Sequence, residues 1–143
     1  MDDFRSSWPS GLSINDSILD RIYLSHPYSV VYPTIDTIDD DVASLGQGCL
    51  VLKCDLKKVY RQFPLDPFDY PLLGYQWNGK LYFDVVLPMG LETAPVACQC
   101  STSAVCYMLT QDGCYVVNYL DDFIGVASPD KALQDYETCG SLL

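Results

Sequence analysis

The sequence predicts an α+β domain, with helices packed on one face of an antiparallel sheet. Three observations carry this prediction: an Asn78-Gly79 pair between two apolar runs, an Asp pair inside the apolar segment 114–127, and a helical apolar pattern that begins at residue 93 or 94 and runs to 109. The 143 residues are 49% hydrophobic and 19% charged. This composition is typical of one globular domain with a buried core.

Residues 1–33 are the least regular part of the chain. They are polar, rich in turn signals and weakly periodic, so we expect a loosely ordered lead-in. No apolar run approaches the roughly 20 residues that cross a bilayer, and the N-terminus lacks the basic and apolar regions of a signal peptide. We therefore expect a soluble, intracellular protein without membrane contact; these features do not distinguish cytoplasm from nucleus.

The first predicted helix lies within residues 32–45. Its apolar side chains recur with helical spacing at Ile35, Ile38, Val42 and Leu45. Thr34 or Thr37 can cap its start, and Gly46 can end it. The aspartates of this segment fit its solvated face and its first turn, where the helix dipole favours anions, so we assign them no metal. They are Asp36, Asp39, Asp40 and Asp41.

A short apolar strand follows at residues 49–55 and ends in the carboxylate of Asp55. A charge at the end of a buried strand is unusual. Two interpretations stay open from this segment alone. Asp55 belongs to a functional site, or it caps the helical turn around Lys57–Tyr60.

A hairpin and a long helix come next. Residues 70–77 and 80–87 flank Asn78-Gly79, which is the strongest short hairpin signal, and residues 88–90 break the second strand. The helix follows and runs through residue 109, with Pro95 tolerated in its first turn.

A second hairpin is expected from residues 115–118 and 123–127, with Asp121 and Asp122 at or near its tip. A last helix runs from Lys131 to about Cys139. Helices packed on one face of the sheet would bring the strand of Asp55 beside this hairpin. The three carboxylates would then lie within a few ångström of one another.

The adjacent Asp121 and Asp122 allow two interpretations. Aspartates are ordinary turn residues, so the pair can be a hairpin tip with only a structural role. Two anions crowded among tyrosines and valines also repel each other and lose hydration, which a divalent cation would compensate. Together with Asp55, they would supply the hard oxygen ligands of a two-magnesium site for in-line phosphoryl transfer, with the metals about 3.5–4 Å apart.

Composition adds two constraints. The seven cysteines and the single His26 show no zinc-ligand spacing, so we expect reduced, mostly buried thiols. The net charge is −11, from 8 Lys+Arg against 19 Asp+Glu. A protein that grips a phosphate backbone normally carries a basic groove, so a nucleic-acid function has to account for this deficit.

Three blocks in order carry a family resemblance. The segment 53–64 has an Asp followed five positions later by an aromatic residue, segment 87–95 reads Leu-Pro-Met-Gly-Leu-Glu-Thr-Ala-Pro, and segment 119–122 reads Tyr-Leu-Asp-Asp. They resemble motifs A, B and C of the reverse transcriptase palm. The residues of these blocks are most similar to those of retroelements of the DIRS-like, tyrosine-recombinase group. The resemblance runs from about Ser13 to the C-terminus.

The resemblance implies the roles of individual residues. It makes Asp55, Asp121 and Asp122 the catalytic ligands of Mg²⁺, with Mn²⁺ as the alternative, and it places Tyr60 at the gate that excludes a ribose 2′-hydroxyl. It also implies an RNA or DNA template-primer and a deoxynucleoside triphosphate as partners. The residues expected to bind the nucleotide are Tyr60, Met89, Gly90 and Leu120.

The extent of the resemblance sets the domain prediction. Residues 1–33 would be the lead-in with partial fingers, in which Asn15 matches a fingers asparagine, and residues 34–143 would be a palm core truncated at its C-terminus, without a thumb. Basic fingers, the thumb, RNase H and recombinase segments would lie elsewhere, which partly explains the acidic charge. Met89 and Cys98 stand where the family usually has Phe.

Alternatives to an active polymerase stay open at this level. The chain could be a non-catalytic remnant or domesticated fragment of a retroelement polymerase that serves as an interaction module. It could also be an unrelated acidic metal-binding or hydrolase domain. Whether these 143 residues polymerise by themselves is a separate question from the family.

Overall fold

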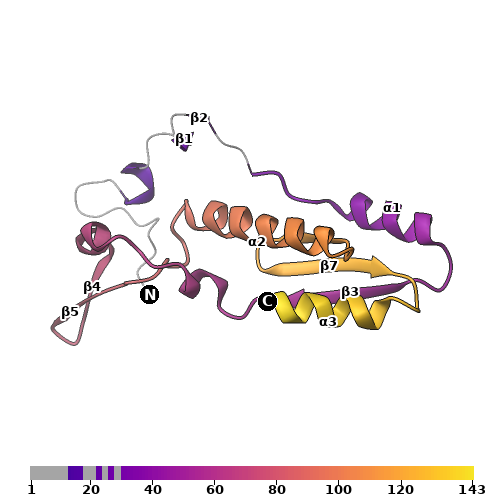
Figure 1. Cartoon of the computed structure of the whole chain (residues 1–143). Helices are drawn as coiled ribbons and strands as arrows, with labels where there is room; N and C mark the ends of the chain where they lie inside the picture. The colour runs from indigo at the N-terminus through magenta and orange to yellow at the C-terminus, as the bar shows by residue number, and fades with distance from the viewer. Residues whose placement is uncertain (1–12, 18–21, 24–25, 28–29) are drawn as a thin grey trace. The chain divides into compact units, whose positions relative to one another are not determined.

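The computed structural model describes residues 13–17, 22–23, 26–27 and 30–143. Most of the predicted lead-in lies outside these residues. The chain divides into two compact units, one of Met1–Ser29 with Lys58–Val96 and one of Val30–Lys57 with Ala97–Leu143. Helices and antiparallel strands alternate along the chain (Figure 1), which confirms the predicted α+β class. The boundary expected between residues 33 and 34 stays a prediction.

The second unit is built on a three-stranded antiparallel sheet. Its strands are β3 (Leu50–Asp55), β6 (Val116–Tyr119) and β7 (Asp122–Ala127), in the order β3-β7-β6. In the register, Asp55 pairs with Asp122, and Asp122 pairs with Tyr119. The strand that ends in Asp55 therefore lies directly beside the hairpin that carries the Asp pair, as the sequence predicts.

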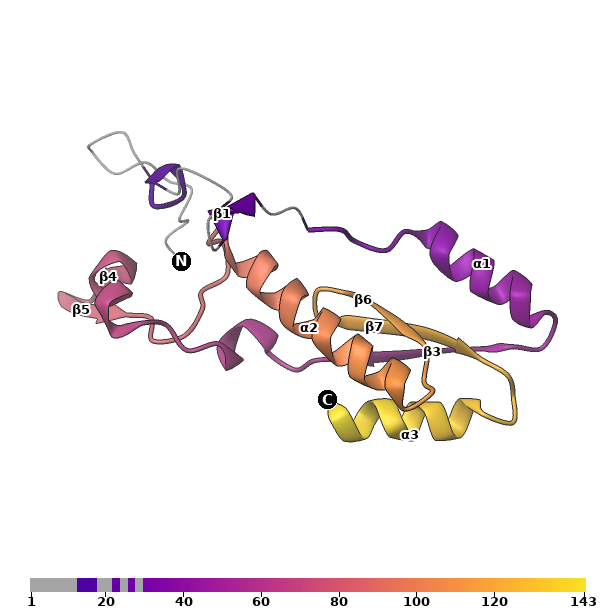
Figure 2. The ribbon, with the colours of Figure 1, turned by 45° about the horizontal axis from the view of Figure 1, so that its top comes forward.

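Two helices cover one face of this sheet. They are α2 (Ala94–Gln111), which enters the second unit at residue 97, and α3 (Ala132–Leu142); both appear beside the strands in Figure 2. Strand side chains alternate between the two faces, and the face that carries Leu52, Val116 and Phe123 forms the core with Leu109 of α2 and Cys139 of α3. The predicted packing of helices on one face is confirmed.

Helix α1 (Ile35–Leu45) lies within the segment that the sequence predicts to be helical, and its apolar residues are not buried. Gly46 ends it with φ +79°, a conformation that glycine adopts without strain. None of its residues is buried, and Ile35 is 78% exposed, although the helix packs beside β7. Asp39 and Asp40 are exposed, as expected for a solvated face. Helical spacing predicts that apolar residues share a face, not that another element covers it.

The first unit contains the predicted hairpin in a shortened form. Strands β4 (Gly74–Trp77) and β5 (Lys80–Phe83) pair around Asn78 and Gly79, whose φ angles of 49° and 72° suit a tight two-residue turn. The expected strand from residue 70 is wrong, because Pro67–Leu73 forms a 3₁₀ helix, η3, that Asp66 caps by accepting a hydrogen bond from the Phe68 amide at 3.0 Å. Two prolines in this segment lack the N–H that a strand needs.

The second strand of this hairpin also ends early. It was expected to reach residue 87 and ends at Phe83; beyond it, Val86 forms an isolated bridge with Pro64. Arg61 of the 3₁₀ helix η2 (Val59–Gln62) places Nη1 3.2 Å from Asp84 Oδ1, immediately after the strand.

In the part of the chain that the structure describes, no helix is long and apolar enough to cross a membrane.

All seven cysteines are free thiols, and three of them are buried: Cys98, Cys114 and Cys139. Burial raises the pKa of Cys98 to about 11 and that of Cys139 to about 12, because desolvation disfavours the thiolate. Cys100 on the outer side of α2 is exposed. The thiolate is the reactive form, so the buried thiols are protected from modification both because reagents cannot reach them and because they stay protonated.

We expect iodoacetamide at pH 8 to label Cys100 first and to reach Cys98, Cys114 and Cys139 only when the chain unfolds. Thiols of the unfolded chain ionise near 9.0, whereas Cys139 in the fold holds its proton to about 12. The folded state therefore loses stability as the pH rises above about 9. Mass spectrometry of labelled peptides measures the order in which the cysteines react, with urea-unfolded protein as the control. Labelling of Cys139 as fast as Cys100 would contradict it.

Candidate active site

Asp55 and Asp122 lie opposite each other at one end of the sheet. Asp55 ends β3, Asp122 begins β7, and the register pairs them directly. The side chains of such partners share one face, with Cβ atoms roughly 4.5–5.5 Å apart. Because Cys54 and Phe123 belong to the core face, both carboxylates lie on the other face of the sheet. Like charges in this position destabilise a sheet unless a cation compensates them.

Asp121 lies in the turn that joins β6 to β7. Leu120 and Asp121 form this turn, and Leu120 has a positive φ of 54°. The carbonyl oxygen of Asp121 accepts a hydrogen bond from the Leu56 amide at 2.9 Å. Leu56 follows Asp55 directly, so one backbone hydrogen bond ties the end of β3 to the turn. The structure thus brings Asp55, Asp121 and Asp122 to neighbouring backbone positions.

A lysine compensates part of this negative charge. Lys53 places Nζ 2.9 Å from Asp122 Oδ1. The hydrogen bond and charge of Asp122 raise the pKa of Lys53, and the charges of Asp55 and Asp121 add to this. The side chains of the pair are 59% and 37% exposed, so water screens the interaction and either partner can exchange it for another. Sequence reasoning missed Lys53, because its partner lies on another strand.

The donor chemistry of the cluster suits a hard divalent cation. Carboxylate oxygens are the ligands that Mg²⁺ and Mn²⁺ prefer. Among the described residues, no three His, Cys, Asp or Glu side chains are arranged as a ready-made cage for a metal ion. With Lys53 at Asp122, the carboxylates would have to turn toward a cation that replaces this ammonium group. The oxygen ligands therefore suit a hard divalent cation by their chemistry, whereas the described side chains are not arranged around one.

Beneath the turn lies a buried polar residue that sequence reasoning also missed. Gln99 of α2 is 4% exposed, and its side-chain amide bonds the backbone of both Asn118 and Leu120. The signal that could have pointed to it is a glutamine between Cys98 and Cys100 in the first half of the predicted helix.

The other predicted site residues belong to the first unit. Tyr60 is half-buried in η2, Met89 is 63% exposed, and Gly90 has φ +97°. Asp55, Leu120, Asp121 and Asp122 belong to the second unit. The predicted residues therefore form two groups, each placed within its own unit.

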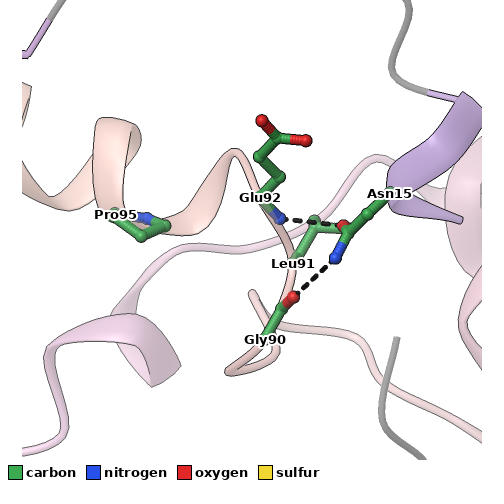
Figure 3. A pocket seen from close by; sticks show the side chains of 5 residues that line it. All are labelled: Asn15, Gly90, Leu91, Glu92 and Pro95. Carbon is green, nitrogen blue, oxygen red and sulfur yellow. Dashed lines mark hydrogen bonds between the residues drawn. The ribbon is translucent and has the colours of Figure 1, made fainter. Parts of the chain in front are cut away.

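Asn15 holds the loop that contains Gly90. Its Nδ2 donates to the Gly90 carbonyl at 2.9 Å, and its Oδ1 accepts from the Glu92 amide at 2.9 Å (Figure 3). These contacts border an open hollow of about 390 Å³, lined by Asn15, Gly90, Leu91, Glu92 and Pro95. A residue that the sequence assigned to the fingers by resemblance is thus bonded to the loop of the second block.

Comparisons with known proteins agree with this architecture. A family model described as "Reverse transcriptase (RNA-dependent DNA polymerase)" matches residues 9–141. The crystal structure of the prototype foamy virus protease-reverse transcriptase is similar to this chain, with 26% identity and a TM-score of 0.54, over 65% of this chain and 12% of that structure. No curated protein sequence matches this chain.

Two structures with bound nucleic acid share the fold. The foamy viral protease-reverse transcriptase in complex with an RNA/DNA hybrid is 21% identical, with a TM-score of 0.52, over 64% of this chain and 12% of that one. The complex with double-stranded DNA is 15% identical, with a TM-score of 0.53, over 64% of this chain and 20% of that one. This chain therefore spans only a small part of the length of these solved enzymes.

Proposed function

This chain belongs to the reverse transcriptase (RNA-dependent DNA polymerase) family, and we propose that it is the fingers-palm part of an enzyme that copies RNA into DNA. The observation that carries the proposal is the meeting of Asp55, Asp121 and Asp122 at one end of a sheet whose other face is packed against helices. Carboxylates at adjacent strand ends, on the face away from the core, are accessible to a metal-bound substrate.

We propose that these three aspartates hold two Mg²⁺ ions, or Mn²⁺. When bound, such ions activate the primer 3′-hydroxyl and stabilise the leaving pyrophosphate. Asp55 and Asp122 would act from adjacent strands and Asp121 from the turn, while Lys53 releases Asp122. The hydrogen bond between Leu56 and Asp121 would keep the strand end and the turn at a constant separation.

We propose further that the nucleotide contacts Tyr60, Met89, Gly90 and Leu120. The motif resemblance supports this assignment, with Tyr60 beside the sugar. The bonds from Asn15 to Gly90 and Glu92 support a rigid loop at the second block. An ordered loop lowers the entropy cost of positioning a substrate.

The partners follow from the same reasoning. We propose an RNA or DNA template-primer and a deoxynucleoside triphosphate, supported by the hybrid and duplex bound to the foamy viral enzyme. A net charge of −11 does not favour a phosphate backbone. Basic segments of a longer polypeptide, such as a thumb, would then provide much of the grip. We propose a retroelement of the DIRS-like group as the source, which the residues of the three blocks support, and we propose an intracellular location.

Primer extension on an RNA template tests the proposal. We expect the chain to add deoxynucleotides to a DNA primer with Mg²⁺ or Mn²⁺ and to add none with EDTA. Independently, magnesium at 100 times its dissociation constant should raise the free energy of unfolding by about 2.7 kcal/mol, because it binds only the folded state. Calcium and a template-free reaction are the controls for extension. If the chain shows no primer extension and metal does not raise its stability, a non-catalytic remnant is favoured.

A further inference from the structure

We infer that Gln99 is a positioning residue that sets the conformation of the aspartate turn, and that it thereby controls metal binding at Asp121 and Asp122. The inference rests on the proposed function for its metal and on hydrogen bonds of the structure for its geometry. Gln99 itself lies in α2, and its side chain bonds Ser103, Asn118 and Leu120, so it acts on the carboxylates through the backbone of the turn.

The side-chain amide of Gln99 bonds two backbone groups on either side of Tyr119. Its Nε2 donates to the Asn118 carbonyl at 3.1 Å, and its Oε1 accepts from the Leu120 amide at 2.8 Å. Strand β6 lies at the edge of the sheet, so these groups have no neighbouring strand to pair with. Gln99 takes the place of that strand, and both ends of its amide are satisfied at a site that is 4% exposed.

The turn needs such support, because Leu120 has a φ of 54°. Side chains with a Cβ atom are disfavoured in this region, and two-residue hairpins with a positive φ at the first turn position usually have glycine there. The hydrogen bond from the Leu120 amide to Gln99 holds this residue in the disfavoured conformation. The next residue is Asp121, so the same hydrogen bond determines the backbone position from which the Asp121 carboxylate extends.

A second buried contact holds the same strand without reaching the turn. Asn118 Nδ2 donates to Thr102 Oγ1 at 2.6 Å, and Thr102 is 1% exposed. Thr102 lies one turn after Gln99 on α2, and both are buried polar residues that bond Asn118. Its hydroxyl bonds the Asn118 side chain and, within α2, the carbonyls of Cys98 and Gln99, but not the backbone of the turn. It therefore provides a matched control for the effect of a buried polar group on stability.

The effect of Gln99 on the metal follows from geometry. The Asp121 carbonyl also accepts the hydrogen bond from Leu56, so a change of the turn alters the separation between Asp121 and Asp55. Groups that orient metal ligands without touching the metal typically change its affinity by about 10–100-fold when they are removed. We expect Gln99 to act in this way.

The experiment uses the full ¹⁵N-labelled chain and Mn²⁺ alone as the probe. Paramagnetic broadening of the Asp121, Asp122 and Gly125 amide signals gives the affinity at the site, and hydrogen exchange of the Leu120 amide reports its bond to Gln99. We expect Gln99→Met to weaken Mn²⁺ binding at least about tenfold and to expose the Leu120 amide to exchange. Thr102→Val should lower the melting temperature but keep the affinity within about twofold.

Gln99→Asn is the second variant, in case Gln99→Met does not fold. It keeps a buried amide but is one methylene shorter, so it cannot reach both backbone groups, and the same weakening is expected. An affinity within about twofold of wild type with Leu120 still protected overturns the inference. Absence of broadening in the wild-type protein contradicts the proposed function instead, and Leu120 exchange in the variants then still decides whether Gln99 holds the turn.

Discussion

Replacing Asp121 by Asn is expected to lower the rate of metal-dependent primer extension by about 10²–10³-fold. The substitution removes one negative charge and keeps the size of the side chain. Asparagine also tolerates turn geometry, and the carbonyl that accepts from Leu56 belongs to the backbone, so the turn is retained. The loss would therefore come from the metal site and not from the fold. Initial rates on an RNA template with Mg²⁺ or Mn²⁺ measure it.

Asp130→Asn is the matched control for this prediction. Asp130 lies in the same unit, is exposed, and follows β7 in the turn before α3. The variant has the same change in net charge, and we expect a rate within about twofold of wild type. A rate for Asp121→Asn above one tenth of the wild-type rate would rule out Asp121 as a principal ligand.

Gly125→Ala is expected to lower the free energy of unfolding by about 3 kcal/mol. A Cβ atom on Gly125 would lie 2.8 Å from the Tyr115 carbonyl oxygen, 2.8 Å from Val116 Cγ1 and 3.0 Å from Leu52 Cδ1. The carbonyl oxygen belongs to the backbone and cannot rotate away. The neighbouring strand segments would have to shift, which disturbs the sheet that carries the aspartates. Urea denaturation at constant pH measures the change.

Gly140→Ala provides the opposite result for the same chemical change. Gly140 is exposed in α3, and a Cβ atom there would meet nothing within 4 Å. Alanine should stabilise this helix by about 0.5–1 kcal/mol, because glycine loses more conformational freedom on folding. A Gly125→Ala variant within about 0.5 kcal/mol of wild type would show that the strands can separate without cost.

Local signals predicted most of the elements. Helix α1 ends at Gly46, the Asn78-Gly79 turn has two positive φ angles, and β6 and β7 meet at the Asp pair. Each of these depends on residues close together in the chain. The exception is η3, where prolines and the Asp66 cap outweighed an apolar pattern that suited a strand equally well.

The sequence by itself determined the family and the order of the three blocks, and it singled out the three aspartates as candidates, because such motifs consist of neighbouring residues. Only the tertiary structure decided what those aspartates contact. Lys53 reaches Asp122 on the neighbouring strand, and Gln99, which is 21 residues from Leu120 in the sequence, reaches it from helix α2. Sequence spacing does not predict such contacts, since they depend on the register of the sheet and on the packing of α2 against the edge of the sheet. The same reason explains Ile35, whose exposure depends on what covers the helix and not on its own periodicity.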